Sequence, residues 1–137
     1  MIKFDGHVDM MSESFGKKEK LKSKKEIELL FAEGKSIAKY PVRLVFKMVS
    51  FEEDVAFKVG TSVSKRYFKK AVDRNRIKRL MRESYRKNKY IVANTTHQFT
   101  FMFLYTGKEM PEYDLIESKI KGILLKFVKQ EIEPKSK

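Results

Sequence analysis

The chain has 137 residues, of which 42% are apolar, including 11 Phe and 6 Tyr, so we expect one domain with a substantial buried core. It contains no cysteine, and its two histidines, His7 and His97, lack the spacing of metal ligands. These counts exclude disulfides and argue against a zinc enzyme or a Cys–His nucleophile.

The positive charge is concentrated in two segments. The formal net charge is +13; residues 65–89 contribute +10 and residues 17–25 contribute +5, so the rest is nearly neutral. This distribution favours a polyanionic partner. An anionic membrane would also attract it, but a membrane-bound helix needs a wide apolar face, and no apolar run is long enough to span a bilayer. With no basic-then-apolar leader, we expect a soluble cytoplasmic protein without a membrane partner.

The first half of the chain predicts a disordered arm, one helix and several strands. Residues 1–20 form the basic, aperiodic arm. Ser23 and Glu26 predict a capping box for a helix over about 24–33, and Gly34 suits the position after its end. We expect a turn at 34–36. Alternating apolar residues predict strands at 42–49 and 55–59, with Gly60 as a bulge or break before a third short strand at 61–64.

The second half predicts a long basic helix over 71–88, a strand over 99–106 and a final helix after Pro111. Residues 131–137 are expected to form a disordered tail. We therefore predict a single α+β domain over 21–130, with one sheet of about four strands and helices packed on it, in the order α-β-β-β-α-β-α.

The helix predicted over 71–88 has an apolar side and a cationic side. Ile77, Leu80, Met81 and Ser84 share the apolar side, with Tyr85 at its edge. Like charges repeat at i,i+4 on the other side, which costs a few tenths of a kcal/mol per pair unless a polyanion covers them. A solvated face usually mixes charges instead. This pattern favours contact with nucleic acid over a solvated face.

The residues of a self-sufficient nuclease are missing from the sequence. Such an enzyme needs a carboxylate cluster for metal or an acid–base pair at the scissile phosphate. The acids here lie in separate segments, such as the turn at 52–54, and show no pattern of such a cluster or pair. We therefore expect binding and no catalysis by the protein itself. An Arg-rich helix fits a DNA major groove, whereas folded RNA is recognised by shape, phosphates and unstacked bases; the residues alone leave both ligands open.

Two segments, SVSKR at 62–66 and AVDRNRIKRLMRE at 71–83, resemble the signature of the bacterial ribonuclease P protein family. The resemblance covers about 110 residues. It implies a left-handed β-α-β crossover that includes the Arg-rich helix, although right-handed crossovers are the default. It also implies the protein subunit of a tRNA-processing ribonucleoprotein endonuclease, a hydrolase. In that enzyme the catalytic RNA cleaves the 5′ leader from precursor tRNA with magnesium, which is bound mainly by the RNA subunit, and the protein alone is inactive.

The resemblance also implies roles for individual residues. The protein binds the catalytic RNA through the signature helix and the segment before it. The residues predicted for this contact are Lys65, Arg66, Lys69, Lys70, Arg74, Asn75, Arg76, Lys78, Arg79, Arg82 and Arg86.

The resemblance places the single-stranded leader in a cleft between the first helix and the sheet. There Phe31 either stacks on a base or belongs to the core. Ile27 and Val45 occupy positions that are often aromatic in the family, so stacking is expected to be weaker here. The residues predicted for the leader-binding cleft are Phe31, Lys35, Ser36, Arg43 and Lys108. The alternative function is a non-enzymatic RNA- or ribosome-binding protein.

Overall fold

The structure is a computed structural model that describes residues 17–133. In this range it has three α-helices and four strands in the predicted order. They are α1 (Lys24–Glu33), β1 (Lys35–Lys39), β2 (Val42–Val49), β3 (Phe57–Val63), α2 (Ala71–Asn88), β4 (Gln98–Tyr105) and α3 (Tyr113–Phe127). Three short helical turns accompany them: η1 (Lys17–Glu19), η2 (Lys89–Val92) and η3 (Val128–Ile132).

The four strands form one mixed sheet in the order β1-β2-β4-β3. β1 and β4 each pair with β2 in antiparallel fashion, whereas β3 and β4 are parallel neighbours joined through α2. The pairing places Val42, Tyr105 and Val63 in one row. The turn before β2, the loop at 64–70 and the loop after β4 therefore meet at one end of the sheet, which we call the 64–70 end.

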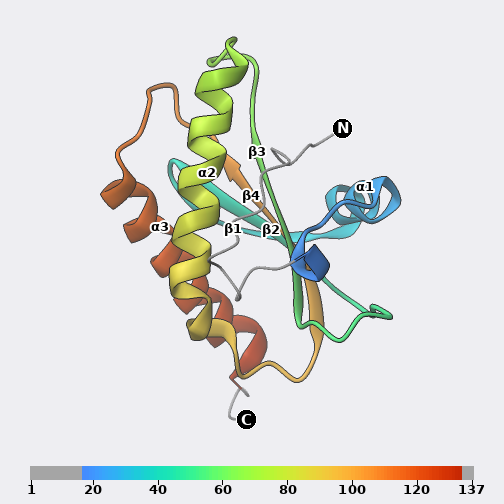
Figure 1. The fold of residues 1–137 in the computed structure, drawn as a ribbon. Coiled ribbons are helices and arrows are strands. Elements are labelled where there is room, and N and C mark those ends of the chain that lie inside the picture. The colour runs from blue at the N-terminus through green and yellow to red at the C-terminus, as the bar shows by residue number, and fades with distance from the viewer. Residues whose placement is uncertain (1–16, 134–137) are drawn as a thin grey trace.

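Helices cover the two faces of the sheet unequally. α2 and α3 lie side by side, and α1 lies apart from them (Figure 1). The larger core lies beneath α2 and α3, where the ring of Phe127 lies 4.9–5.0 Å from the rings of Phe46, Phe99 and Phe101. The smaller core lies beneath α1 and joins Leu21, Ile27, Leu30, Val45 and Met102.

The predicted bounds of α1, β2 and α2 are confirmed. The Ser23 hydroxyl accepts a hydrogen bond from the Glu26 backbone N–H at 3.2 Å, as the capping box predicts. Two predictions are wrong. The turn expected at 34–36 runs into strand β1. The bulge or break expected at Gly60 is absent, and residues 61–63 belong to β3 instead of a separate strand, because β3 is continuous from Phe57 to Val63.

Gly34 is needed for space and not for an unusual backbone conformation. Its φ angle is −77°, which any residue adopts. A Cβ atom at this position would lie 2.5 Å from the Leu30 carbonyl oxygen and 2.9 Å from that of Phe46. Glycine therefore lets the chain leave α1 and enter β1 directly against β2.

The ordered domain is longer than predicted at both ends. Lys17–Glu19 form a turn, Lys20 bridges to Val59, and the Leu21 N–H donates to the Val59 carbonyl at 3.1 Å. At the other end, Ile132 packs against the larger core. The rest of the predicted arm, residues 1–16, and the last four residues lie outside the described range.

Candidate nucleic-acid interface

The loop at 64–70 is held in place by residues on both of its sides. The Arg74 guanidinium donates to the carbonyl oxygens of Phe68 at 2.8 Å and Lys69 at 3.0 Å. The buried Phe68 ring packs 5.9 Å from the ring of Tyr105. At the start of the loop, the Ser64 hydroxyl accepts from the Arg66 N–H at 2.9 Å. Arg74 thus orders the loop, and the loop's charged side chains project outward.

Exposed cations cover this loop and the first half of α2. Within residues 17–133, none of these exposed cations forms an ion pair with a carboxylate. Their charge is therefore available to an anionic partner. We call them the N-terminal cationic surface; its members are Lys65, Arg66, Lys69, Lys70, Arg76 and Arg79.

The remaining predicted residues in the first part of α2 are half-buried: Arg74, Asn75, Lys78 and Arg82. One guanidinium nitrogen of Arg82, Nη1, is shielded from solvent. The buried side of α2 is shifted from the predicted one: Tyr85, predicted at its edge, is only 2% exposed, whereas Leu80, predicted within it, is half-buried. α2 contacts both β3 and α3, so its covered side is wider than one apolar stripe. Arg82 therefore faces solvent less than its position in the sequence predicts.

Near the C-terminal end of α2, two cations have acidic partners. Arg86 is paired with Glu83 within the helix. Lys89, which follows the helix, forms an ion pair with Glu19 of η1 at 2.7 Å. Asn88 donates to the carboxylate of Glu117 on α3 at 3.1 Å. The structure thus places Arg86, predicted to bind RNA, among groups that already offset its charge.

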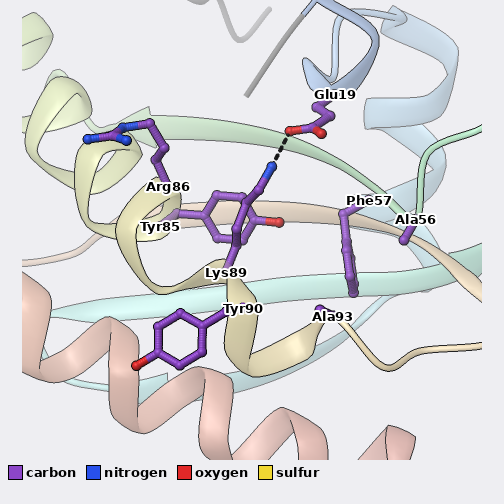
Figure 2. Close-up of a pocket in the computed structure, with 8 residues that line it drawn as sticks. All are labelled: Glu19, Ala56, Phe57, Tyr85, Arg86, Lys89, Tyr90 and Ala93. Carbon is purple, nitrogen blue, oxygen red and sulfur yellow. Dashed lines mark hydrogen bonds and ion pairs between the residues drawn. The ribbon is translucent and has the colours of Figure 1, made fainter. Parts of the chain in front are cut away.

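A pocket of about 410 Å³ lies beside this end of α2. Figure 2 shows the Glu19–Lys89 ion pair crossing in front of the Tyr85 ring, with Arg86 extending away from that pair. Burial raises the pKa of Tyr85, with a smaller contribution from the charge of Glu19. The Glu19–Lys89 ion pair contributes to the wall of the pocket. The pocket is lined by Glu19, Ala56, Phe57, Tyr85, Arg86, Lys89, Tyr90 and Ala93.

On the other face of the sheet, ion pairs orient α1. Glu26 lies 4.0 Å from Lys58 of β3, and Glu33 lies 3.4 Å from Lys47 of β2. Both lysines lie far along their strands from the 64–70 end. At about 100° per residue, Phe31 lies about 140° around the helix from Glu26 and about 160° from Glu33. Phe31 is therefore on the opposite edge of α1, which points toward the 64–70 end.

Two of the predicted leader residues lie on the same face as Phe31. Arg43 donates from its guanidinium to the Ser36 hydroxyl at 3.0 Å. The row Arg43, Leu104 and Ser62 crosses three adjacent strands on this face. We call Phe31, Ser36 and Arg43 the α1-side surface.

The Phe31 side chain is 47% exposed, so the alternative that it belongs to the core is wrong. Ile27 and Val45, in contrast, are only 6% and 8% exposed and belong to the smaller core. The two positions at which the resemblance implied weaker stacking are thus filled by aliphatic core residues. Phe31 remains the aromatic ring available on this edge of α1.

The other two predicted leader residues lie elsewhere. Lys35 pairs opposite Phe46 and so points to the face covered by α2 and α3, where it lies 3.7 Å from Glu131. Lys108 lies with its ammonium 5.6 Å from the ring centroid of Tyr67. Tyr67 was not assigned a role from the sequence. Its signal was an aromatic residue inside a basic run, SKRYFKK.

The acidic turn at 52–54 has a structural role. Lys58 donates to Glu53 at 2.9 Å, and this hydrogen bond lowers the pKa of the Glu53 carboxyl. Between residues 17 and 133, no three His, Asp or Glu side chains are grouped as metal ligands would be. No helix in the same range has the length and apolar character needed to cross a bilayer.

Comparisons with known proteins identify a family for this chain and match its fold. The family profile "Ribonuclease P" matches residues 15–128. The ribonuclease P protein component of Porphyromonas gingivalis strain W83 is 36% identical over 116 residues, covering 81% of this chain and 84% of the relative. The solved ribonuclease P protein of Thermotoga maritima has a TM-score of 0.64 at 24% identity, covering 79% of this chain and 96% of that one. That of Staphylococcus aureus has a TM-score of 0.61 at 21% identity, covering 77% and 92%. The chain belongs to the ribonuclease P protein family.

Proposed function

We propose that this chain is the protein subunit of a cytoplasmic ribonuclease P and binds the catalytic RNA through the N-terminal cationic surface. Its bound form aids the magnesium-dependent removal of the 5′ leader from precursor tRNA. The observation that supports this most directly is a set of exposed cations without carboxylate partners in residues 17–133, located within the segment that matches the family signature.

The electrostatics of this surface support a polyanionic partner. Clustered like charges are unfavourable in the free protein, and a phosphate backbone removes that cost while it releases counterions. Because Arg74 holds the loop through two carbonyl contacts, the cations need little rearrangement on binding. A rigid cationic surface suits an RNA that is recognised by shape and phosphates.

We assign the chemistry of cleavage to the RNA, with its magnesium bound mainly there. The acids near the α1 side of the sheet form ion pairs within the fold: Glu26 and Glu53 both bind Lys58. In this proposal the side chains of the protein bind and orient RNA, and none takes part in proton transfer.

We place the leader on the α1-side surface. Arg43 offers a cation, and Phe31 offers an exposed ring on which a base can stack. This surface reaches the 64–70 end of the sheet, from which the N-terminal cationic surface begins. A single RNA–substrate complex can therefore contact both surfaces at once.

Reconstitution tests the proposal. RNA-free protein should leave precursor tRNA intact at physiological magnesium, and a bacterial ribonuclease P RNA plus the protein should cleave it at the mature 5′ end faster than the RNA alone. Metal-dependent cleavage by the RNA-free protein would contradict the proposal. Equal affinity for ribosomal RNA and ribonuclease P RNA, with no increase in cleavage, would favour the general RNA- or ribosome-binding alternative.

A further inference from the structure

Two cations from separate segments each lie near the ring of Tyr67. Arg66, in the loop after β3, has its guanidinium carbon 5.5 Å from the ring centroid. Lys108, in the loop after β4, has its ammonium 5.6 Å from the same centroid. From the sequence, Arg66 was predicted to bind the catalytic RNA and Lys108 to lie in the leader cleft. In the structure both side chains lie beside Tyr67, a residue that was assigned no role from the sequence.

The ring of Tyr67 is both accessible and held in place. It is 41% exposed. The backbone after it is fixed by the buried Phe68 and by the two hydrogen bonds from Arg74. The backbone before it is fixed by the hydrogen bond between Arg66 N–H and Ser64. An aromatic ring on such a loop loses little conformational entropy when a ligand stacks on it.

The surroundings of Tyr67 match the requirements of single-stranded RNA. Proteins bind unpaired nucleotides by stacking bases on aromatic rings and placing cations on the adjacent phosphates. Bases inside a duplex are already stacked on one another and do not offer a free face. Neither Arg66 nor Lys108 forms an ion pair with a carboxylate in the described range, residues 17–133.

We propose that Tyr67 is a stacking platform for one unpaired nucleobase, with Arg66 and Lys108 on the flanking phosphates. This inference rests on the proposed function, which supplies the RNA. The nucleotide comes from one of two sources: an unpaired position of the catalytic RNA or the leader of precursor tRNA. Tyr67 lies at the 64–70 end, which both surfaces share, so both sources are within the reach of the fold.

Three variants of the full-length protein test the platform. Tyr67→Leu removes the ring, Tyr67→Phe keeps it, and Tyr90→Leu removes a ring that is 68% exposed but lies at the C-terminal end of α2. Thermal unfolding checks that each variant folds. The two readouts are the affinity for the catalytic RNA and the ratio of affinities for precursor and mature tRNA in the reconstituted enzyme.

We expect Tyr67→Leu to lower one of these two readouts by about 5-fold or more, the loss of one stacked base. A change in the first readout assigns the nucleotide to the catalytic RNA, and a change in the second assigns it to the leader. Tyr67→Phe and Tyr90→Leu should remain within about two-fold of the unmodified protein. If Tyr67→Leu behaves like Tyr90→Leu in both readouts, the platform is refuted.

A third readout separates this inference from the proposed function. A ten-nucleotide single-stranded oligouridylate binds any stacking platform, whether or not the protein serves ribonuclease P. If the unmodified protein fails to stimulate cleavage but Tyr67→Leu still weakens oligouridylate binding, the proposed function falls and the platform stands. If the protein stimulates cleavage and Tyr67→Leu changes no readout, the platform falls and the proposed function stands.

Discussion

The two ends of α2 have similar charge in the sequence and different environments in the structure. At the N-terminal end, exposed cations extend from the helix and from the ordered loop before it, with no carboxylate partner in the described residues. At the C-terminal end, Glu83 holds Arg86, and Glu19 holds Lys89. The cations at the N-terminal end are available to a partner, whereas Arg86 and Lys89 at the C-terminal end are bound by acids of the protein itself.

This difference shows that a run of basic residues is not a uniform binding surface. Phosphate binding depends on cations whose charge is not already neutralised by nearby acids. Lys89 is bound by an acid 70 positions earlier in the chain, and Arg86 by an acid three positions earlier. This difference supports the proposal that the RNA contact lies on the first half of α2 and the loop at 64–70, and that the second half is mainly structural.

The largest expected effect comes from the exposed arginines of the first half. The double variant Arg76→Ala/Arg79→Ala should weaken binding to the catalytic RNA on the order of 100-fold at physiological salt, from about 1.5 kcal/mol for each charge-assisted contact. Thermal stability should be nearly unchanged because both side chains are exposed. Filter binding with RNA-free protein measures the affinity. Binding within about two-fold of the unmodified protein would place the contact elsewhere.

A smaller effect is expected from Arg74, which positions the loop. Arg74→Lys keeps the positive charge and shortens the group that reaches the carbonyls of Phe68 and Lys69. It should weaken RNA binding about 10-fold, since two hydrogen bonds of roughly 1 kcal/mol each are lost or distorted, and leave the salt dependence of binding unaltered. If Arg74→Lys matches the unmodified protein, the loop is ordered without Arg74.

On the other face of the sheet, Phe31 tests whether the α1-side surface contacts the leader. Phe31→Leu should lower the preference for precursor over mature tRNA by about 1 kcal/mol if the ring stacks on a leader base. Ile27→Phe is the contrasting variant: because Ile27 is 6% exposed, the larger ring should destabilise the fold by about 1–3 kcal/mol and give no gain in leader affinity. A normal substrate preference in Phe31→Leu would remove Phe31 from the leader contact.

The smallest effect is expected from the C-terminal end of the helix. Lys89→Ala removes a partly buried ion pair with Glu19 and should lower the free energy of unfolding by about 1 kcal/mol. Affinity for the catalytic RNA should change less than two-fold. Urea denaturation measures the first quantity. A large loss of RNA affinity with normal stability would mean that this end also binds RNA.

The elements with a strong local pattern could be predicted from the sequence. The helix at 71–88 has an apolar period and basic residues on its other side, and its bounds agree with the structure. β1 could not be predicted, because its residues KSIAK contain one buried side chain, Ile37, and the strand forms through pairing with β2. Once β1 is a strand, Lys35 and Ser36 must point to opposite faces. That alternation explains why the structure separates two residues predicted for one cleft.

The candidate site was predictable where it depends on local sequence and not where it depends on long-range contacts. The signature residues at 64–79 lie together because they are consecutive in one loop and one helix. The contact between Tyr67 and Lys108 joins residues 41 positions apart through the parallel pairing of β3 and β4. The pairing of Lys89 with Glu19 depends on η1, which was predicted to be disordered.

The most direct test of the division of α2 is the salt dependence of RNA binding in two double variants that each remove two cations. Each lost phosphate contact lowers the slope of log affinity against log salt by about 0.7–0.9. Arg76→Ala/Arg79→Ala should therefore lower the slope by about 1.5, whereas Arg86→Ala/Lys89→Ala, which removes the two cations already bound by acids, should lower it by less than about 0.5. Equal decreases in the two variants would contradict the account, because both ends of the helix would then contact RNA alike.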